Sequence, residues 1–150
     1  MRKVVRSALV PYSAAEMFAL VDNPEAYPEF LPWCRAAEEH LRDARGVEAT
    51  IEFHKHGIRR LIRTRNSNLA NESIDIQLVD GPFRYLHGHW QFQNLGDAGC
   101  KVSLEMQFEF SNRLVSAVFG RAFEDTCNSL VQAFTVRAAE VYGPRQIRNA

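Results

Sequence analysis

Two pairs of histidines have the spacing that would let a β-strand present both imidazole rings to one metal ion. One residue separates His54 from His56, and one separates His87 from His89; residues i and i+2 of a strand point to the same face. Two such pairs on neighbouring strands could chelate a metal. The adjacent Phe53 and Trp90 have the opposite parity, which predicts that they face the core and the imidazoles face solvent. We therefore expect no metal site.

Nucleophilic catalysis is not indicated either. Cys34, Cys100 and Cys127 are odd in number and have no C-x-x-C spacing, so neither a disulfide framework nor a zinc site is expected. Cys34 and Cys127 lie in apolar contexts, where a thiol is unreactive. No G-x-S-x-G motif occurs, and Glu105 and Glu109 fall on the polar face of a predicted strand. We predict that the protein is not an enzyme and has no catalytic residues.

A run of cations without acids lies between His54 and Arg65. Gly57 marks a predicted hairpin tip, so we expect several of these side chains to project together. They could contact phosphate, either of RNA or of anionic lipid headgroups, although no aromatic RNA-binding block accompanies them. The alternative is a solvated hairpin balanced by acids such as Glu38 and Glu39. The candidate basic patch comprises Lys55, Arg59, Arg60, Arg63 and Arg65.

The chain as a whole has the size and composition of one globular domain. It has 150 residues, of which 46% are hydrophobic and 24% charged, and its net charge is zero. These values disfavour disorder and a protein that coats nucleic acid. No apolar run approaches the roughly 20 residues of a membrane span, and the first residues resemble no signal peptide. We expect a reduced, cytoplasmic protein, with contact to the inner membrane at most peripheral.

Helical elements are predicted near the beginning and at the end of the chain. After a strand over residues 2–10, Ser13 and Glu16 form a capping box for a short helix. Pro24 can start a second short helix, and the aromatic and proline-rich segment 27–33 predicts a tightly packed corner. Apolar residues at spacings of three and four predict a long helix from Ser111 or Asn112 to Gly143. We expect one domain over residues 1–143 and a flexible tail over residues 144–150.

Between these helices the apolar residues alternate with a period of two. The alternation covers residues 47–53, 74–78, 86–92 and 102–110, with turn signals between the runs. It predicts an antiparallel meander of about six strands with one apolar face. Together with the first strand and the long helix, this is an α+β architecture.

A curved sheet with one apolar face must be covered, and the long helix is the only element that is long enough. Because such a sheet is strongly twisted, a straight helix cannot touch all of it, and a cavity for a hydrophobic molecule is expected between them. The alternative is that the same residues fill a solid core. The candidate ligand-binding residues are Phe30, Leu31, Trp33, Ile51, Phe53, Ile62, Ile76, Leu78, Trp90, Phe92, Met106, Phe108, Phe119, Phe123 and Cys127.

Several sequence blocks resemble the START-like (polyketide cyclase-like) family, which includes the mitochondrial coenzyme-Q-binding proteins. The blocks are Tyr27–Cys34, Thr64–Asn66, Val79–Phe83, Gly88–Phe92, Phe108–Phe110 and Ala133–Gly143. The subgroup that they most resemble is the bacterial ribosome association toxin A. The resemblance implies the helix-grip fold, in which seven antiparallel strands wrap around the C-terminal helix. It also implies an apolar tunnel for ubiquinone or a related polyprenyl lipid.

Two functions are therefore expected, and they belong to different classes. The first is non-catalytic binding or transport of ubiquinone or a similar lipid in support of respiratory electron transport, with no cofactor required. In that case the Phe30–Trp33 corner could gate the cavity or touch a membrane surface. The second is association with the large ribosomal subunit, which blocks subunit joining and uses the basic patch. A polyketide cyclase-type enzyme is a weaker alternative, because fold does not imply function.

Overall fold

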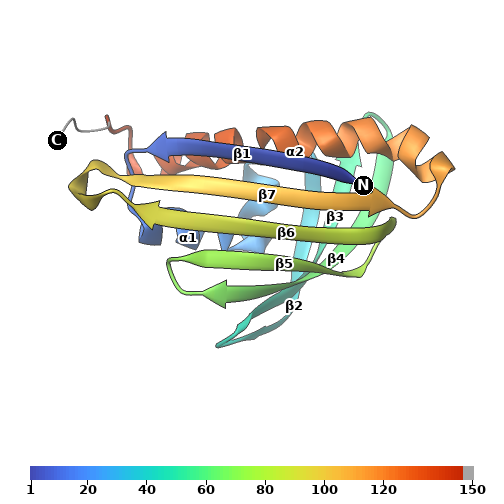
Figure 1. Ribbon diagram of the computed structural model, residues 1–150, viewed down its shortest axis with the longest axis horizontal. Coiled ribbons are helices and arrows are strands. Elements are labelled where there is room, and N and C mark those ends of the chain that lie inside the picture. Colours follow the sequence, from blue (N-terminus) through green and yellow to red (C-terminus); the bar gives the residue numbers. More distant parts are fainter. Residues whose placement is uncertain (147–150) are drawn as a thin grey trace.

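Seven antiparallel strands form a single sheet that curves around one long helix (Figure 1). In sheet order the strands run β1-β7-β6-β5-β4-β3-β2, so β2 to β7 form a meander and β1 pairs with β7. The structure is a computed structural model that describes residues 1–146, and residues 147–150 of the predicted tail lie outside the described residues. The strands are β1 (Arg2–Val10), β2 (Cys34–Asp43), β3 (Gly46–Lys55), β4 (Ile58–Leu69), β5 (Ser73–Asp80), β6 (Phe83–Asn94) and β7 (Cys100–Phe110).

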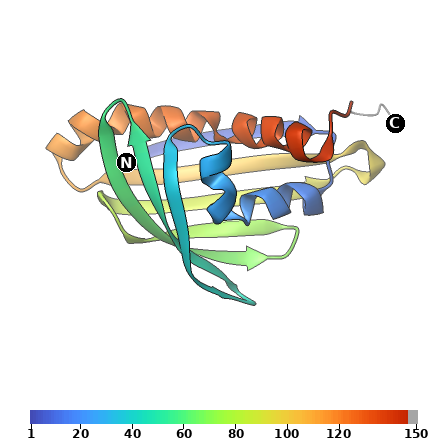
Figure 2. The ribbon, with the colours of Figure 1, turned by 180° about the vertical axis from the view of Figure 1, so that it is seen from behind.

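The helices lie where sequence signals place them. They are α1 (Ala14–Val21), the 3-10 helices η1 (Pro24–Glu29) and η2 (Gly96–Ala98), and α2 (Arg113–Tyr142). The Ser13–Glu16 capping box begins α1, and the Asn112 side chain caps α2 by accepting a hydrogen bond from the Val115 backbone N–H. Figure 2 shows α1 and η1 on the concave side of the sheet, with η1 beside β2. Within residues 1–146, no helix is long and apolar enough to cross a membrane.

The helix-grip architecture predicted from the sequence is confirmed. The strand alternation is regular in β7, where every second residue from Cys100 to Phe110 is buried. In this strand the buried residues form the inner face, which packs toward α2, and the other face is polar, as expected for an antiparallel sheet with one solvated side.

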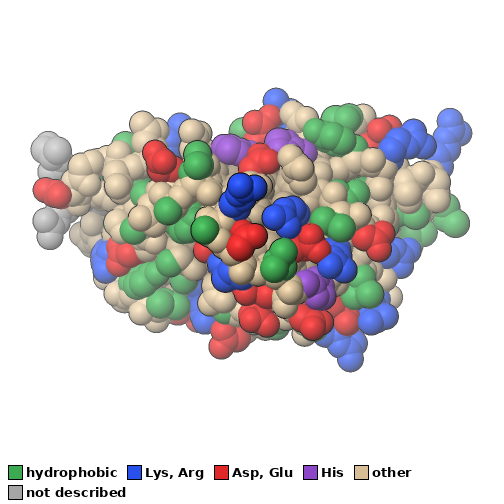
Figure 3. Space-filling view, turned by 90° about the horizontal axis from the view of Figure 1, so that it is seen from below, with side chains coloured by type: hydrophobic (Ala, Val, Ile, Leu, Met, Phe, Trp, Pro, Cys, Tyr) green, Lys and Arg blue, Asp and Glu red, His purple; other side chains and the backbone are tan. Residues whose placement is uncertain are grey.

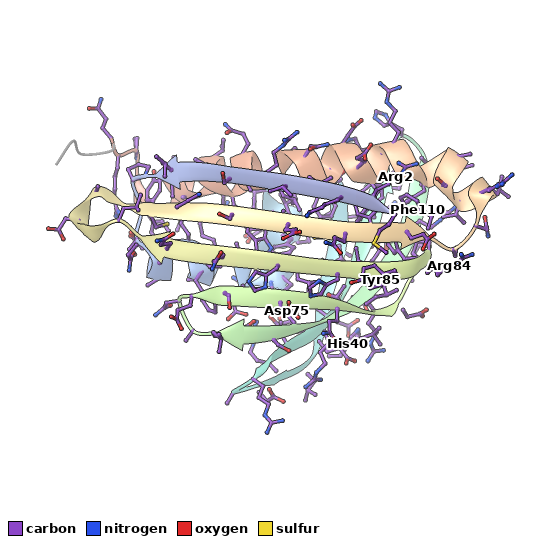
Figure 4. The ribbon with its side chains drawn as sticks, in the orientation of Figure 1. Arg2, His40, Asp75, Arg84, Tyr85 and Phe110 are labelled. Atoms are coloured by element: carbon purple, nitrogen blue, oxygen red, sulfur yellow. The ribbon has the colours of Figure 1, made fainter. Side chains whose placement is uncertain are left out.

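Arg2 fastens the beginning of β1 to the beginning of α2. Its guanidinium lies 5.1 Å from the centre of the Phe110 ring and donates a hydrogen bond to the Ser116 hydroxyl at 3.0 Å (Figure 4). Gly120 leaves room for this side chain, because an added Cβ would approach the Arg2 guanidinium to 3.0 Å. The cation therefore bridges the edge strand and the helix.

The other end of α2 is fastened through Glu16. Arg145, which falls in the segment predicted to be loose, donates hydrogen bonds to both Glu16 carboxylate oxygens at 2.7 and 3.0 Å. The Tyr142 hydroxyl donates to the Glu16 backbone carbonyl at 2.9 Å, and the Arg145 guanidinium lies 5.0 Å from the centre of the Tyr12 ring. Residues up to Arg145 are thus held against α1.

How closely the core is packed differs along the length of α2. Near the beginning of the helix it is packed solid with aromatic rings, and Phe53 and Phe119 lie 5.0 Å apart between centroids while Phe83 and Phe123 lie 4.9 Å apart. We call this the aromatic cluster; it consists of Phe53, Phe83, Phe108, Phe110, Phe119 and Phe123. The unfilled space lies farther along α2.

Candidate ligand-binding cavity

An apolar cavity lies between the concave face of the sheet and the middle of α2. Its volume, counted as the space that the centres of water molecules can occupy, is about 100 Å³. A single water needs roughly 10–15 Å³ on this measure, so the interior is not packed solid. The cavity is lined by Pro24, Tyr27, Trp33, Ala49, Ile51, Ile62, Thr64, Asn66, Ile76, Leu86, Trp90, Met106, Phe123, Thr126, Cys127, Leu130 and Phe134.

Eight of the fifteen candidate ligand-binding residues come together in this lining. They are Trp33, Ile51, Ile62, Ile76, Trp90, Met106, Phe123 and Cys127. The other seven lie elsewhere. Phe53, Phe108 and Phe119 belong to the aromatic cluster, and Phe92 packs on Phe18. Phe30 packs on Phe134 and Leu31 lines a surface groove, while Leu78 is partly buried against the core.

Nine lining residues were missing from the sequence-based set. They are Pro24, Tyr27, Ala49, Thr64, Asn66, Leu86, Thr126, Leu130 and Phe134. Strand parity contained the signal for several of them, because Ala49 shares a face with Ile51, and Thr64 and Asn66 share a face with Ile62. The sequence-based set was chosen among large apolar residues, so it omitted these small and polar side chains.

Polar side chains interrupt the apolar wall along β4. Thr64 and Asn66 face the cavity, and the Thr64 hydroxyl donates a hydrogen bond of 3.4 Å to the Asn66 Oδ1. Farther along the strand, Asn68 donates to Asp22 at 2.8 Å. The inner face of β4 thus changes from apolar at Ile62 to polar at Asn68. A ligand in the cavity therefore meets hydrogen-bonding groups on one side.

Trp33 lies between the cavity and a groove on the surface. It lines the cavity and also a surface groove of about 550 Å³. The Trp33 ring packs on Phe53 at 5.7 Å between centroids, and its backbone carbonyl accepts a hydrogen bond from His54. The backbone is thus fixed to β3, and the Trp33 side chain belongs to the walls of both spaces. The groove is lined by Leu31, Pro32, Trp33, His54, Lys55, His56, Ser129, Gln132 and Ala133.

The ionisable groups of the cavity are held in their neutral forms. Cys127 lines the cavity, and burial raises the pKa of its thiol far above its ordinary value. Burial likewise raises the pKa of the Cys34 and Cys100 thiols to about 11. The Tyr27 hydroxyl donates to the Val21 carbonyl, and burial raises its pKa well above the ordinary value. Thiols with raised pKa values are poor nucleophiles near neutral pH.

The five cations of the candidate basic patch lie on two faces of the sheet. Phe53, which is fully buried, pairs with Arg60 across the β3–β4 hairpin, so Lys55 and Arg60 take the inner-face parity. Arg59, Arg63 and Arg65 lie on the outer face. Several of the cations therefore do project from one face, as expected, while Lys55 and Arg60 take the other, because side chains alternate between faces along each strand.

Carboxylates of β3 and the β2–β3 turn neutralise the outer-face arginines. Arg59 pairs with Glu52 at 3.1 Å, Arg63 pairs with Glu48, and Arg65 lies 3.9 Å from Asp43. The acids predicted to balance the hairpin were Glu38 and Glu39, but Glu39 pairs with Arg42. Figure 3 shows basic and acidic side chains interspersed on the face seen from below. This part of the surface is a mixture of charges.

The two histidine pairs lie on different parts of the sheet. His54 and His56 are exposed at the β3–β4 hairpin. His87 and His89 lie half-buried on the outer face of β6, where their rings contact the same Asp75 oxygen at 2.8 and 3.3 Å. In the part of the chain that the structure describes, no group of three or more histidine, cysteine or acidic residues could hold a metal ion.

Comparison with known proteins finds a matching family and several similar proteins. Residues 10–135 match the family described as polyketide cyclase / dehydrase and lipid transport. The chain is 42% identical to the ribosome association toxin RatA of Escherichia coli, over 97% of this chain and 92% of that protein. It is also 25% identical to the mitochondrial coenzyme Q-binding protein COQ10 of Drosophila melanogaster, over 99% of this chain and 63% of that protein.

Solved structures share the fold. The Zhui aromatase/cyclase of Streptomyces sp. R1128 superimposes with a TM-score of 0.82 at 12% identity, over 93% of this chain and 94% of that chain. A START superfamily protein of Mycobacterium smegmatis superimposes with a TM-score of 0.79 at 18% identity, over 93% and 98% of the two chains. At these identities the likeness concerns the fold alone.

Proposed function

The chain belongs to the polyketide cyclase / dehydrase and lipid transport family, and on this premise we propose that it binds a hydrophobic small molecule in the cavity without transforming it. Ubiquinone or a related polyprenyl lipid is the ligand that we favour, and support of respiratory electron transport is the role that we infer. The name of the COQ10 relative, a coenzyme Q-binding protein, supports this choice of ligand.

The observation that carries the proposal is an apolar cavity left open inside a core that is otherwise closely packed. Protein interiors normally leave few voids larger than a water molecule, and an empty cavity costs stability. An apolar ligand would recover that cost and would add roughly 25 cal/mol for each Å² of apolar surface removed from water, before the costs of association. The cavity is thus suited to an apolar occupant.

The size of the cavity limits how much of such a ligand it can enclose. An apolar cavity of about 150 Å³ binds benzene in an engineered protein, so the present cavity of about 100 Å³ suits a ring or a short isoprenoid segment. A longer chain must continue beyond it. Displacement of the Trp33 ring would let the chain continue into the groove lined by Pro32, Lys55 and Gln132.

Binding without chemistry fits the groups that line the cavity. The Cys127 thiol is held protonated and the Tyr27 hydroxyl is engaged by a backbone carbonyl, so neither is prepared to act as a nucleophile or base. The relatives reported above are named as a toxin and as a binding protein. Such a function would place the protein in the cytoplasm, with contact to the inner membrane only while ligand is exchanged.

The test is to identify what the protein carries. The protein is purified from its own host, extracted with organic solvent and analysed by mass spectrometry, and the emptied protein is then titrated with ubiquinone. We expect a stoichiometric quinone or polyprenyl lipid in the extract and saturable quenching of tryptophan fluorescence in the titration, since Trp33 and Trp90 both line the cavity. Repeated extracts without such a molecule, together with no uptake of ubiquinone, would contradict the proposal.

A second candidate function is association with the large ribosomal subunit. It is favoured by the name of the E. coli relative, which is 42% identical over 97% of this chain. The β3–β4 hairpin provides a footprint for RNA phosphates through Lys55 and Arg60, which lie apart from the paired outer-face arginines. Sedimentation with ribosomes at low and high salt tests it, because phosphate contacts weaken steeply with salt. The cavity itself lies apart from this footprint, although Lys55 also lines the groove next to the cavity.

A further inference from the structure

We propose that the cavity selects an uncharged ligand whose polar end accepts a hydrogen bond from the side-chain amide of Asn66. This inference rests on the proposed ligand-binding function and adds the chemical class of the ligand and the residue that recognises it.

Asn66 is a polar side chain in an apolar part of the wall. In the sheet it lies between Val47 of β3 and Ile76 of β5, and all three have the inner-face parity. The Thr64 hydroxyl donates to the Asn66 Oδ1, which directs the amide nitrogen away from Thr64. Among residues 1–146 the structure shows no acceptor for that nitrogen. Asn66 is half-buried, so its amide nitrogen can donate to a ligand acceptor in the cavity.

The other hydroxyl donors of the lining are already used. The Thr126 hydroxyl donates to the Ala122 carbonyl at 2.9 Å, and the Tyr27 hydroxyl donates to the Val21 carbonyl. Within the described lining, the side-chain N–H donors left for a ligand are therefore the Asn66 amide and the Trp33 and Trp90 indoles. The Asn66 amide can bind a carbonyl or ether oxygen.

The charge of the lining restricts the ligand further. None of the seventeen lining residues, all within the described chain, is an aspartate, glutamate, lysine, arginine or histidine. A buried carboxylate or phosphate would have no countercharge there, and transfer of an unpaired ion from water is strongly unfavourable. Anionic lipids are therefore disfavoured relative to uncharged carbonyl compounds of the same size.

Small probes of similar size test this selectivity. Acetophenone carries a ring and a carbonyl, ethylbenzene lacks the acceptor, and benzoate is an anion. Titrations followed by amide chemical shifts give the dissociation constants and show whether the probe occupies the cavity. We expect benzoate to bind at least 10-fold more weakly than acetophenone.

The decisive quantity is the preference for acetophenone over ethylbenzene, taken as the ratio of their dissociation constants. In Asn66→Leu we expect this ratio to fall about 3- to 10-fold, the size of one hydrogen bond. Gln77→Leu likewise replaces a side-chain amide with leucine, but at an exposed site on β5, and should leave the ratio unchanged. Thr64→Val keeps the amide but removes the hydrogen bond that orients it, and it should lower the ratio about 2-fold.

Failure of this inference differs from failure of the proposed function. If both uncharged probes bind but Asn66→Leu and Thr64→Val leave the ratio unchanged, or if benzoate binds as tightly as acetophenone, the role of Asn66 is refuted while the cavity remains a ligand site. If no uncharged probe binds the wild-type cavity, the proposed function and this inference both fail. Thr64→Val keeps the test valid if Asn66→Leu does not fold.

Discussion

Gly88 of β6 lies directly opposite Met106 of β7, and a methyl group added to Gly88 would collide with the Met106 sulfur. It would also come within 3.2 Å of the Ile76 side chain. Met106 and Ile76 both line the cavity. The absence of a side chain at position 88 therefore gives the Met106 side chain its place in the sheet and keeps it out of the cavity.

We predict that Gly88→Ala pushes the Met106 side chain into the cavity and weakens ligand binding about 10-fold. Because a flexible side chain yields into empty space, the free energy of unfolding should change by less than about 1 kcal/mol, below the usual cost of overpacking. Titration with ubiquinone and thermal unfolding measure the two effects. The double variant Gly88→Ala, Met106→Ala should regain binding; a double variant as weak as Gly88→Ala alone would show that volume is not the cause.

Trp33 is predicted to control the rate at which the ligand enters and leaves. Trp33→Ala removes the wall between the cavity and the surface groove, so we expect ligand association and dissociation to accelerate at least 10-fold. The equilibrium constant should change less. Trp90 is the other tryptophan and lines the cavity, so its fluorescence in stopped-flow mixing reports both rates. Trp33→Phe, which keeps a ring, should be intermediate, and equal rates in all three proteins would exclude Trp33 as the gate.

Glu16 should make the stability of the fold depend on pH in the acidic range. Hydrogen bonds from Arg145 and from the Ser13 N–H hold the pKa of Glu16 below its ordinary value of 4.5. A carboxyl with a lowered pKa contributes stability above its unfolded pKa, and this contribution is lost as the pH falls through its folded pKa. The free energy of unfolding should therefore decrease as the pH falls below about 5.

Glu16→Gln should remove part of that acid dependence and lower stability slightly at pH 7. Chemical denaturation at several pH values measures it, and Glu72→Gln, at an exposed turn, is the matched control. An unchanged pH dependence in Glu16→Gln would show that the contacts of Arg145 with Glu16 do not hold the end of α2 in solution.

The sequence predicted which faces of the strands point inward but could not predict where the core stays open. Ile51 and Phe53 share the inner face of β3, yet Ile51 lines the cavity while Phe53 packs 5.0 Å from Phe119. The difference depends on how far each lies along α2, and strand alternation carries no information about that distance. Ile62 was chosen because it is large and apolar; Thr64 and Asn66 share its strand face, but their polarity kept them out of the predicted site.

The ion pairs of the β3–β4 hairpin were likewise not predicted from the sequence. A run of arginines without local acids suggested a basic patch, but the acids that pair with Arg59 and Arg63 are Glu52 and Glu48 on the neighbouring strand. Cross-strand partners depend on the register of the hairpin. Once Gly57 is taken as the turn, the pairing of Thr50 with Arg63 follows, so the register could have been counted from the turn.

If the hairpin binds ribosomal RNA, the cations free of carboxylates should dominate the contact. Lys55→Glu combined with Arg60→Glu should lower sedimentation with ribosomes about 10-fold at moderate salt and reduce the salt dependence by about two phosphate contacts. The exchange of Glu48 and Arg63, which keeps their ion pair, is the control and should have little effect. Because neither change reaches the cavity lining, binding of a ligand short enough to stay within the cavity should persist in both variants. Sedimentation that is unaffected by Lys55→Glu and Arg60→Glu would exclude the hairpin as the footprint and leave the cavity as the functional site.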